Sequence, residues 1–109
     1  MKFNVIVTDN FERKVKRLSK KYSSLKADLK PIFDQLSNNP TFGKAIGNNC
    51  YKIRFSISSK GQGKSGGARM ITYVRFVKNN VFLIDIYDKS EKESISETEL
   101  IELISLIME

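Results

Sequence analysis

The sequence of 109 residues contains no histidine, no tryptophan and a single cysteine, Cys50. The absence of histidine excludes histidine-based acid/base catalysis, Ser-His and Cys-His dyads, and metal sites with histidine ligands. A lone cysteine forms neither an internal disulfide nor a structural zinc cluster. Asp85 and Asp88 could bind a metal, but two scattered carboxylates favour a structural or capping role. We therefore expect no metal and no cofactor.

Long hydrophobic runs are also missing. No apolar stretch approaches the roughly 18 residues of a membrane-spanning helix. Residues 1–8 include a lysine and alternate polar with apolar side chains, unlike a signal peptide. Hydrophobic residues make up 40% of the chain and charged residues 28%, a balance typical of one folded domain of this length. We expect a single cytoplasmic domain over residues 1–109, with no membrane partner.

Acidic residues are absent from the middle of the chain. Residues 1–34 contain nine Lys and Arg and four Asp and Glu, whereas residues 35–84 contain eight Lys and Arg and no acid. Residues 85–109 contain two Lys and eight acids, and the formal net charge of the whole chain is +7. The basic block is either a solvated surface or a surface that binds phosphate, and convergence of its side chains on one face would favour the second reading.

Helical periodicity predicts three helices. Residues 9–12 have the pattern of a helix start, with Asp9 as the N-cap. A second helix begins near Ser24, and Pro31 inside its apolar pattern predicts a kink or a later start. Residues 96–99 form a capping box that opens a C-terminal helix. The apolar face of that last helix either packs on the core of its own domain or is covered by another chain.

Three alternating segments predict the strands of an antiparallel meander: residues 51–57, 68–77 and 81–87. Together with a short strand before the first helix, they predict an α+β fold of order β-α-α-β-β-β-α, with the two N-terminal helices on one face of the sheet. Tyr73 is expected to point away from the helices, where its ring could stack on a base. If the apolar sets face the helices, the open face of the sheet carries Lys52, Arg54, Arg69, Arg75 and Tyr87.

The glycine-rich segment at residues 60–67 does not form a nucleotide-binding P-loop. A Walker motif needs a glycine five positions before the Gly63-Lys64-Ser65 trio, where this chain has Ser58. A P-loop also leads into a helix, whereas a strand is predicted from residue 68. We expect a flexible hairpin loop whose Lys60 and Lys64 contact an RNA backbone.

Three segments in series resemble the RelE/HigB-like toxins of bacterial type II toxin–antitoxin modules: YKIRF at residues 51–55, GKSGGARMITY at 63–73 and IYDKSEKE at 86–93. The resemblance covers nearly the whole chain and implies a RelE-like fold. It further implies a metal-independent endoribonuclease that cleaves messenger RNA in the ribosomal A site. A cognate antitoxin would neutralise this toxin, and operator DNA would be bound only through the toxin–antitoxin complex.

The same resemblance assigns roles to individual residues. Lys52 and Arg54 match the basic pair of the first meander strand, and Arg69 matches the arginine after the glycine turn. One of Lys52 and Lys89 is expected to transfer protons, while Arg54 and Arg69 hold the scissile phosphate and Tyr87 aligns a base. The expected contacts with the RNA backbone come from Lys60, Lys64, Arg75 and Lys92.

Two other functions remain open from the sequence. One is a non-catalytic toxin of the related ParE type, which acts on DNA gyrase, and the other is a plain nucleic-acid-binding module. The basic strands favour RNA cleavage, because a protein-binding surface does not need cations gathered around a cleft.

Overall fold

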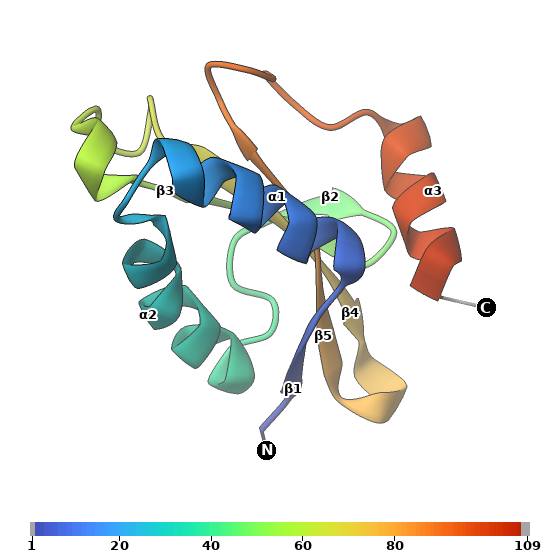
Figure 1. Cartoon of the computed structure of the whole chain (residues 1–109). Helices are drawn as coiled ribbons and strands as arrows, with labels where there is room; N and C mark the ends of the chain where they lie inside the picture. The colour runs from blue at the N-terminus through green and yellow to red at the C-terminus, as the bar shows by residue number, and fades with distance from the viewer. Residues whose placement is uncertain (1, 108–109) are drawn as a thin grey trace.

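A five-stranded sheet with helices on both of its faces organises the chain (Figure 1). The computed structural model describes residues 2–107. Its three helices and five strands confirm the predicted α+β fold. No helix in this range is both long and apolar enough to cross a membrane. In chain order the elements are β1 (Asn4–Val7), α1 (Asp9–Lys21), α2 (Leu25–Asn38), β2 (Lys44–Gly47), β3 (Cys50–Phe55), β4 (Ala68–Arg75), β5 (Asn80–Asp88) and α3 (Glu97–Ile107).

The strands lie in the order β1-β5-β4-β3-β2. The predicted antiparallel meander is present as β3, β4 and β5, while β1 pairs with β5 in parallel. The sequence analysis missed β2, a four-residue edge strand that pairs with β3. The turn between them contains Asn48 and Asn49 at φ of 56° and 59°, the left-handed values of a two-residue hairpin turn. This extra strand places Lys44 opposite Lys52.

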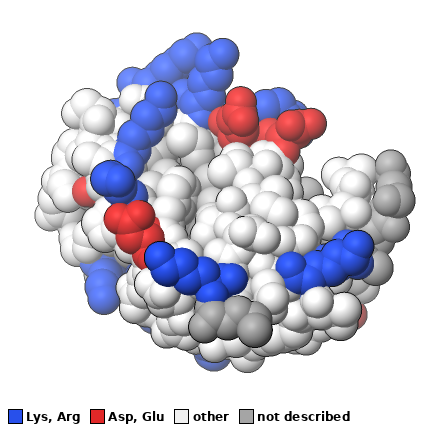
Figure 2. Space-filling view, turned by 90° about the horizontal axis from the view of Figure 1, so that it is seen from below, with Lys and Arg blue, Asp and Glu red and all other residues white. Residues whose placement is uncertain are grey.

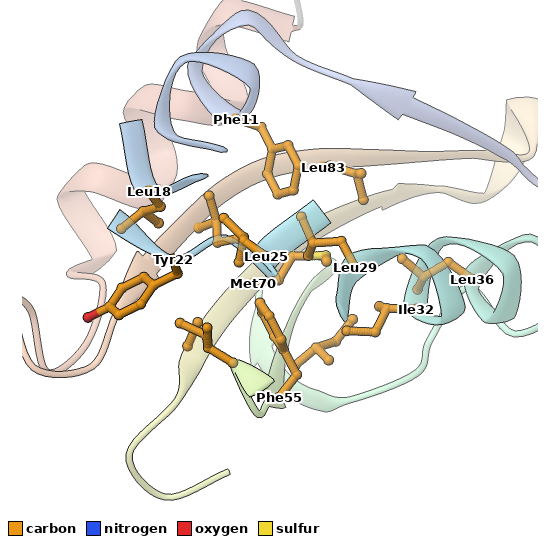
Figure 3. Packing of buried hydrophobic residues seen from close by; sticks show 14 of the residues in the cluster. Phe11, Leu18, Tyr22, Leu25, Leu29, Ile32, Leu36, Phe55, Met70 and Leu83 are labelled. Atoms are coloured by element: carbon orange, nitrogen blue, oxygen red, sulfur yellow. The ribbon is translucent and has the colours of Figure 1, made fainter. Parts of the chain in front are cut away.

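The main hydrophobic core lies between the sheet and the two N-terminal helices (Figure 3). Phe11 and Leu18 on α1, and Leu25, Leu29 and Leu36 on α2, are at most 2% exposed, as the helical periodicity requires. They pack against the buried face of the meander, which includes Ile53, Phe55, Met70 and Leu83. Each fully buried side chain of this size contributes about 1.5–3 kcal/mol to stability.

A second core corrects the expectation of an open sheet face. The C-terminal helix α3 packs on the face opposite α1 and α2, and its Leu100 is buried there with Cys50 and Ile71. Tyr73 and Tyr87 lie on this face as predicted, but they are only 9% and 3% exposed, so neither ring is presented to solvent. Of the two arrangements considered for the C-terminal helix, the structure shows the one in which it packs on its own domain.

A β-bulge in β5 changes which of its side chains share a face. Ile71 pairs with Asp85 and the next residue, Thr72, pairs with Leu83, so Ile84 is the extra residue on β5. Ile86 therefore packs under α1 and α2, whereas Ile84 packs under α3. The strict alternation expected over residues 81–87 would put both isoleucines on one face, which is wrong because simple alternation contains no bulge.

The helix boundaries differ slightly from the predicted ones. The N-cap of α1 is Thr8 rather than Asp9, because the Thr8 hydroxyl accepts a hydrogen bond from the Phe11 amide and donates one to the Leu83 carbonyl. The helix α2 begins after Ser24 and continues through Pro31 to Asn38, so the later start predicted from the proline does not occur.

Gly67 allows β3 and β4 to approach closely at the start of β4. A Cβ at this position would lie 2.1 Å from the Phe55 carbonyl oxygen. We predict that Gly67→Ala lowers the free energy of unfolding by roughly 1–3 kcal/mol, measured by urea denaturation. A Cβ at Gly66 would lie 2.6 Å from Oε1 and 2.7 Å from Cβ of Gln62, an exposed side chain rather than backbone. Gly66→Ala therefore serves as the comparison and should lose less stability than Gly67→Ala. Equal losses in both variants would contradict this reading.

Candidate functional site

Three predicted site residues form a row across the sheet. Arg54 on β3 pairs with Arg69 on β4, and Arg69 pairs with Tyr87 on β5. Side chains directly opposite one another on neighbouring antiparallel strands have Cβ atoms about 4.5–5.5 Å apart. The register of the meander therefore places two guanidinium groups and a phenol side by side.

The two arginines of this row and three lysines near them are called the cation cluster here: Lys44, Lys52, Arg54, Arg69 and Lys89. Within residues 2–107 none of the five forms an ion pair, although lysines elsewhere in the chain are paired. Burial lowers the pKa of the Lys52 ammonium, and the charges of Arg54, Lys44, Arg69 and Lys89 lower it further. Such crowding of like charges without a counter-charge is typical of a site that binds an anion.

The glycine loop between β3 and β4 orients Arg69. The Arg69 side chain is almost fully buried, and its Nη1 donates hydrogen bonds to the carbonyl oxygens of Lys64 at 2.9 Å and Ala68 at 3.1 Å. Burial and the nearby Arg54 charge both lower the pKa of the Arg69 guanidinium, which still remains a cation. The loop thus fixes this group in place, whereas Arg54 beside it is exposed.

Tyr87 is a buried, neutral member of the row. Burial and the neighbouring Asp85 carboxylate raise the pKa of its phenol, while the Arg69 charge acts in the opposite direction. The Lys92 ammonium lies 5.4 Å from the centre of the Tyr87 ring. Because α3 and the segment before it cover this side, the ring cannot stack on a base in this conformation.

Two lysines predicted to contact RNA have acidic partners instead. The Lys60 ammonium lies 2.7 Å from an Asp88 carboxylate oxygen, and its side chain is 10% exposed. Lys92 pairs with Glu99 and lies 3.9 Å from Asp85. Both carboxylates of β5 therefore have the structural role that the sequence favoured over metal binding.

The remaining predicted contacts are exposed but separate. Lys64 lies on the surface of the glycine loop. Arg75 pairs with Asn80 at the opposite end of β4 from Arg69, so six residues of strand, or roughly 20 Å, separate the two arginines. Seen from below, that end of the molecule has a largely uncharged surface with Lys and Arg spread around its margin (Figure 2). The structure therefore does not bring Arg75 into the cation cluster.

Sequence reasoning missed Lys44 because it missed β2. A hollow of about 420 Å³ beside the cluster is lined by Phe42, Gly43, Lys44, Lys52, Ile53 and Arg54. The available signal was the pair Asn48-Asn49, since asparagine tolerates the left-handed conformation of a two-residue hairpin. Recognition of that turn would have paired residues 44–47 with the strand that follows.

Cys50 is not a nucleophile of this site. Its side chain is buried in the core under α3, and burial raises the pKa of the thiol to about 12. A thiol with that pKa is protonated at neutral pH and unreactive.

Comparison with known proteins agrees with the fold and with the sequence resemblance. The structure is similar to that of an arginine-to-alanine double mutant of E. coli toxin RelE in the free state, with 19% sequence identity, a TM-score of 0.65, and coverage of 98% of this chain and 99% of that one. It is also similar to the intact E. coli RelBE toxin–antitoxin complex, with 21% identity, a TM-score of 0.62, and coverage of 79% of this chain and 95% of the matched chain. A third similar structure is the E. coli RelE double mutant bound to a RelB antitoxin peptide, with 22% identity, a TM-score of 0.57, and coverage of 89% of this chain and 98% of that one.

These likenesses establish the fold, and the family follows from the sequence. The family described as the RelE toxin of the RelE/RelB toxin–antitoxin system matches residues 5–107, which is nearly the whole chain. The chain therefore belongs to the RelE toxin family.

Proposed function

We propose that this protein is a metal-independent endoribonuclease that cleaves messenger RNA on the ribosome and thereby inhibits translation. The observation that carries the proposal is the cation cluster, whose members have no acidic partner within residues 2–107. An anion with several phosphates would relieve the mutual repulsion of these groups. RNA supplies such an anion, and it also contains its own nucleophile.

The proposed chemistry needs only groups that the cluster contains. The 2′-hydroxyl of the RNA attacks the adjacent phosphorus, a proton leaves this hydroxyl, negative charge develops on the phosphate, and the departing 5′-oxygen takes up a proton. Arg54 and Arg69 would stabilise the developing charge, since fixed guanidinium groups bind phosphate oxygens in a bidentate manner. Tyr87 would pack beside Arg69 rather than stack on a base, because it is buried.

Lys52 is the stronger candidate for the group that removes the proton. A lysine acts as a general base only in its neutral form, and the pKa of Lys52 is lowered by burial and by four neighbouring cations. Lys89, on the exposed turn after β5, is the other candidate for proton transfer. Backbone contacts farther along the RNA would come from Lys64 and Arg75, which remain exposed or half-buried.

We predict that Arg54→Ala lowers the single-turnover cleavage rate by roughly 10²–10³-fold, the usual loss when one electrostatic donor is removed from an active site. Arg54 is exposed, so the variant should fold normally. Arg13→Ala removes an equally exposed arginine from α1 and serves as the control that keeps the wild-type rate. Equal rates in the two variants would place the scissile phosphate elsewhere.

The pH dependence of cleavage identifies the base. If neutral Lys52 accepts the proton, the rate rises with pH until the pKa of Lys52, which lies below its usual value of 10.5. Lys52→Arg keeps the positive charge but cannot lose its proton, so we predict a rate about 10²–10⁴-fold lower and no rising limb. Loss of that limb in Lys89→Arg, with its retention in Lys52→Arg, would assign the base to Lys89 instead.

Induction of the protein in growing bacteria separates the proposal from the two functions left open by the sequence. Transcripts cut at codon boundaries would support the ribosome-dependent nuclease. A DNA-damage response without cut transcripts would indicate a toxin that acts on gyrase. A plain binding module would give neither. Its association constant for RNA would fall by about 0.7 logarithmic units per phosphate contact for each tenfold rise in salt concentration.

We further propose that a cognate antitoxin neutralises this toxin, as the RelB antitoxin is the partner of RelE in the E. coli complex. An acidic, amphipathic segment would suit the cation cluster, an apolar groove beside α3, or both. The groove is lined by Ile6, Val7, Phe82, Ile84, Leu103, Leu106 and Ile107, together with residues 8–10.

Co-expression with the product of the neighbouring gene tests this partner. We predict that the two proteins co-purify and that bacterial growth recovers, because the partner covers the cationic site. A bound partner that leaves the toxin fully active would contradict occlusion of the site.

A further inference from the structure

The carboxylate of Asp88, at the end of β5, accepts three hydrogen bonds close to the cation cluster. Its side chain is fully buried. One oxygen accepts hydrogen bonds from the Lys60 ammonium at 2.7 Å and from the Ser90 amide at 3.0 Å. The other oxygen accepts a hydrogen bond from the Tyr22 hydroxyl at the end of α1. A single carboxylate thus joins three segments that are far apart in the sequence.

These bonds keep Asp88 ionised. Burial by itself would raise the pKa of the Asp88 carboxyl, but the hydrogen bonds from Lys60, Tyr22 and Ser90 outweigh burial and hold the pKa far below its usual range. The negative charge is therefore present at every pH at which a cytoplasmic enzyme works. A buried charge held in this way is a fixed structural support rather than a titrating group.

Both ends of the glycine loop, residues 61–67, are attached to Asp88. Lys60 precedes the loop, and its ammonium binds the Asp88 carboxylate. Ala68 follows the loop, and it pairs with Asp88 across the β4–β5 ladder. Between these two attachments Gly61 and Gly63 adopt left-handed conformations, which glycine reaches without strain.

The same loop and the turn after β5 hold two members of the cation cluster. The Lys64 carbonyl accepts a hydrogen bond from Arg69, and the Gly67 carbonyl accepts one from the Lys89 amide at 3.1 Å. The Asp88 carbonyl accepts hydrogen bonds from the amides of Glu91 and Lys92, which close the turn that begins with Lys89. A displacement at Asp88 would therefore reach both Arg69 and Lys89.

We propose that Asp88 is a positioning residue of the RNA-cleaving site: by binding Lys60 and Tyr22 it fixes the glycine loop and the following turn, and so aims Arg69 and Lys89 at the scissile phosphate. This inference rests on the function proposed above. It gives Lys60 a part in the site through Asp88 rather than through contact with RNA. Tyr22 forms the second attachment and ties the loop to α1.

The test compares Asp88→Asn with a matched carboxylate variant, Asp28→Asn. Asp28 also accepts three hydrogen bonds, from the Ser24 hydroxyl and from the amide and hydroxyl of Ser58. It therefore holds the turn Ser58–Lys60 before the glycine loop, but it does not bond to Lys60, Gly67 or Lys89. Both proteins are assayed well below their unfolding temperatures. The readouts are kcat and KM for RNA cleavage and the hydrogen exchange rate of the Lys89 amide.

We expect Asp88→Asn to lower kcat by roughly 10–100-fold, because displaced catalytic groups lose their alignment. KM should change by less than about threefold, since the cations remain present. The Lys89 amide should exchange faster in Asp88→Asn and at the wild-type rate in Asp28→Asn. If Asp88→Asn matches Asp28→Asn in both kcat and Lys89 exchange, the positioning role is overturned.

The double variant Asp88→Asn/Lys60→Met covers the case in which Asp88→Asn does not fold. It removes the ammonium that would otherwise be buried without a partner, so it should recover thermal stability but not kcat. Recovery of both would overturn the proposal. If the wild-type protein itself leaves RNA intact, the proposed function fails, and the exchange of the Lys89 amide alone then decides whether Asp88 fixes this loop.

Discussion

Repulsion between like charges at one end of the sheet is the constraint on which the arrangement of this molecule depends. Two unit charges 6 Å apart repel by about 3 kcal/mol at an effective dielectric constant of 20. The sheet register holds Arg54 beside Arg69 and Lys44 beside Lys52 in spite of this cost. A slip of one residue would turn Arg54 towards the core under α1 and α2, so the buried side chains on both faces lock the register.

Other lysines around the site form ion pairs with carboxylates. Lys60 is held by Asp88, and Lys14 lies 2.5 Å from the buried Asp85 carboxylate. Lys92 is shared between Asp85 and Glu99. Asp85, Asp88 and Glu99 therefore form ion pairs with the lysines that surround the site. The cation cluster has no acidic partner within the described residues. This selective pairing is the feature that supports the proposal of an anion-binding site.

Local patterns predicted most of the fold. The helical spacing of Phe11 and Leu18 identified the buried face of α1, and the capping box is present in the mutual hydrogen bonds of Ser96 and Glu99. Alternation identified the three central strands and the row of Arg54, Arg69 and Tyr87. These features depend on interactions between residues close in sequence or on a strict period of two, which a single sequence reveals.

Features that depend on tertiary contacts were missed. The bulge at Ile84 interrupts the period of β5, and the four-residue edge strand β2 is too short to show a period at all. The partner of Lys60 is 28 residues away, so no local pattern could show that its ammonium is bound to Asp88. The cover that α3 places over Tyr73 and Tyr87 depends on packing of the C-terminal helix against strands from the middle of the chain. The row of Arg54, Arg69 and Tyr87 was thus predictable, whereas the burial of Tyr73 and Tyr87 and the membership of Lys44 were not.

The central claim is that fixed cations assist attack by the RNA's own 2′-hydroxyl. The most direct measurement uses purified ribosomes and two messenger RNAs that differ by one 2′-deoxy nucleotide in the A-site codon. The account predicts that the all-ribose message is cut, leaving a 2′,3′-cyclic phosphate and a 5′-hydroxyl, while the message with the 2′-deoxy nucleotide at the scissile position stays intact. Cleavage of both messages, or of neither, would contradict it.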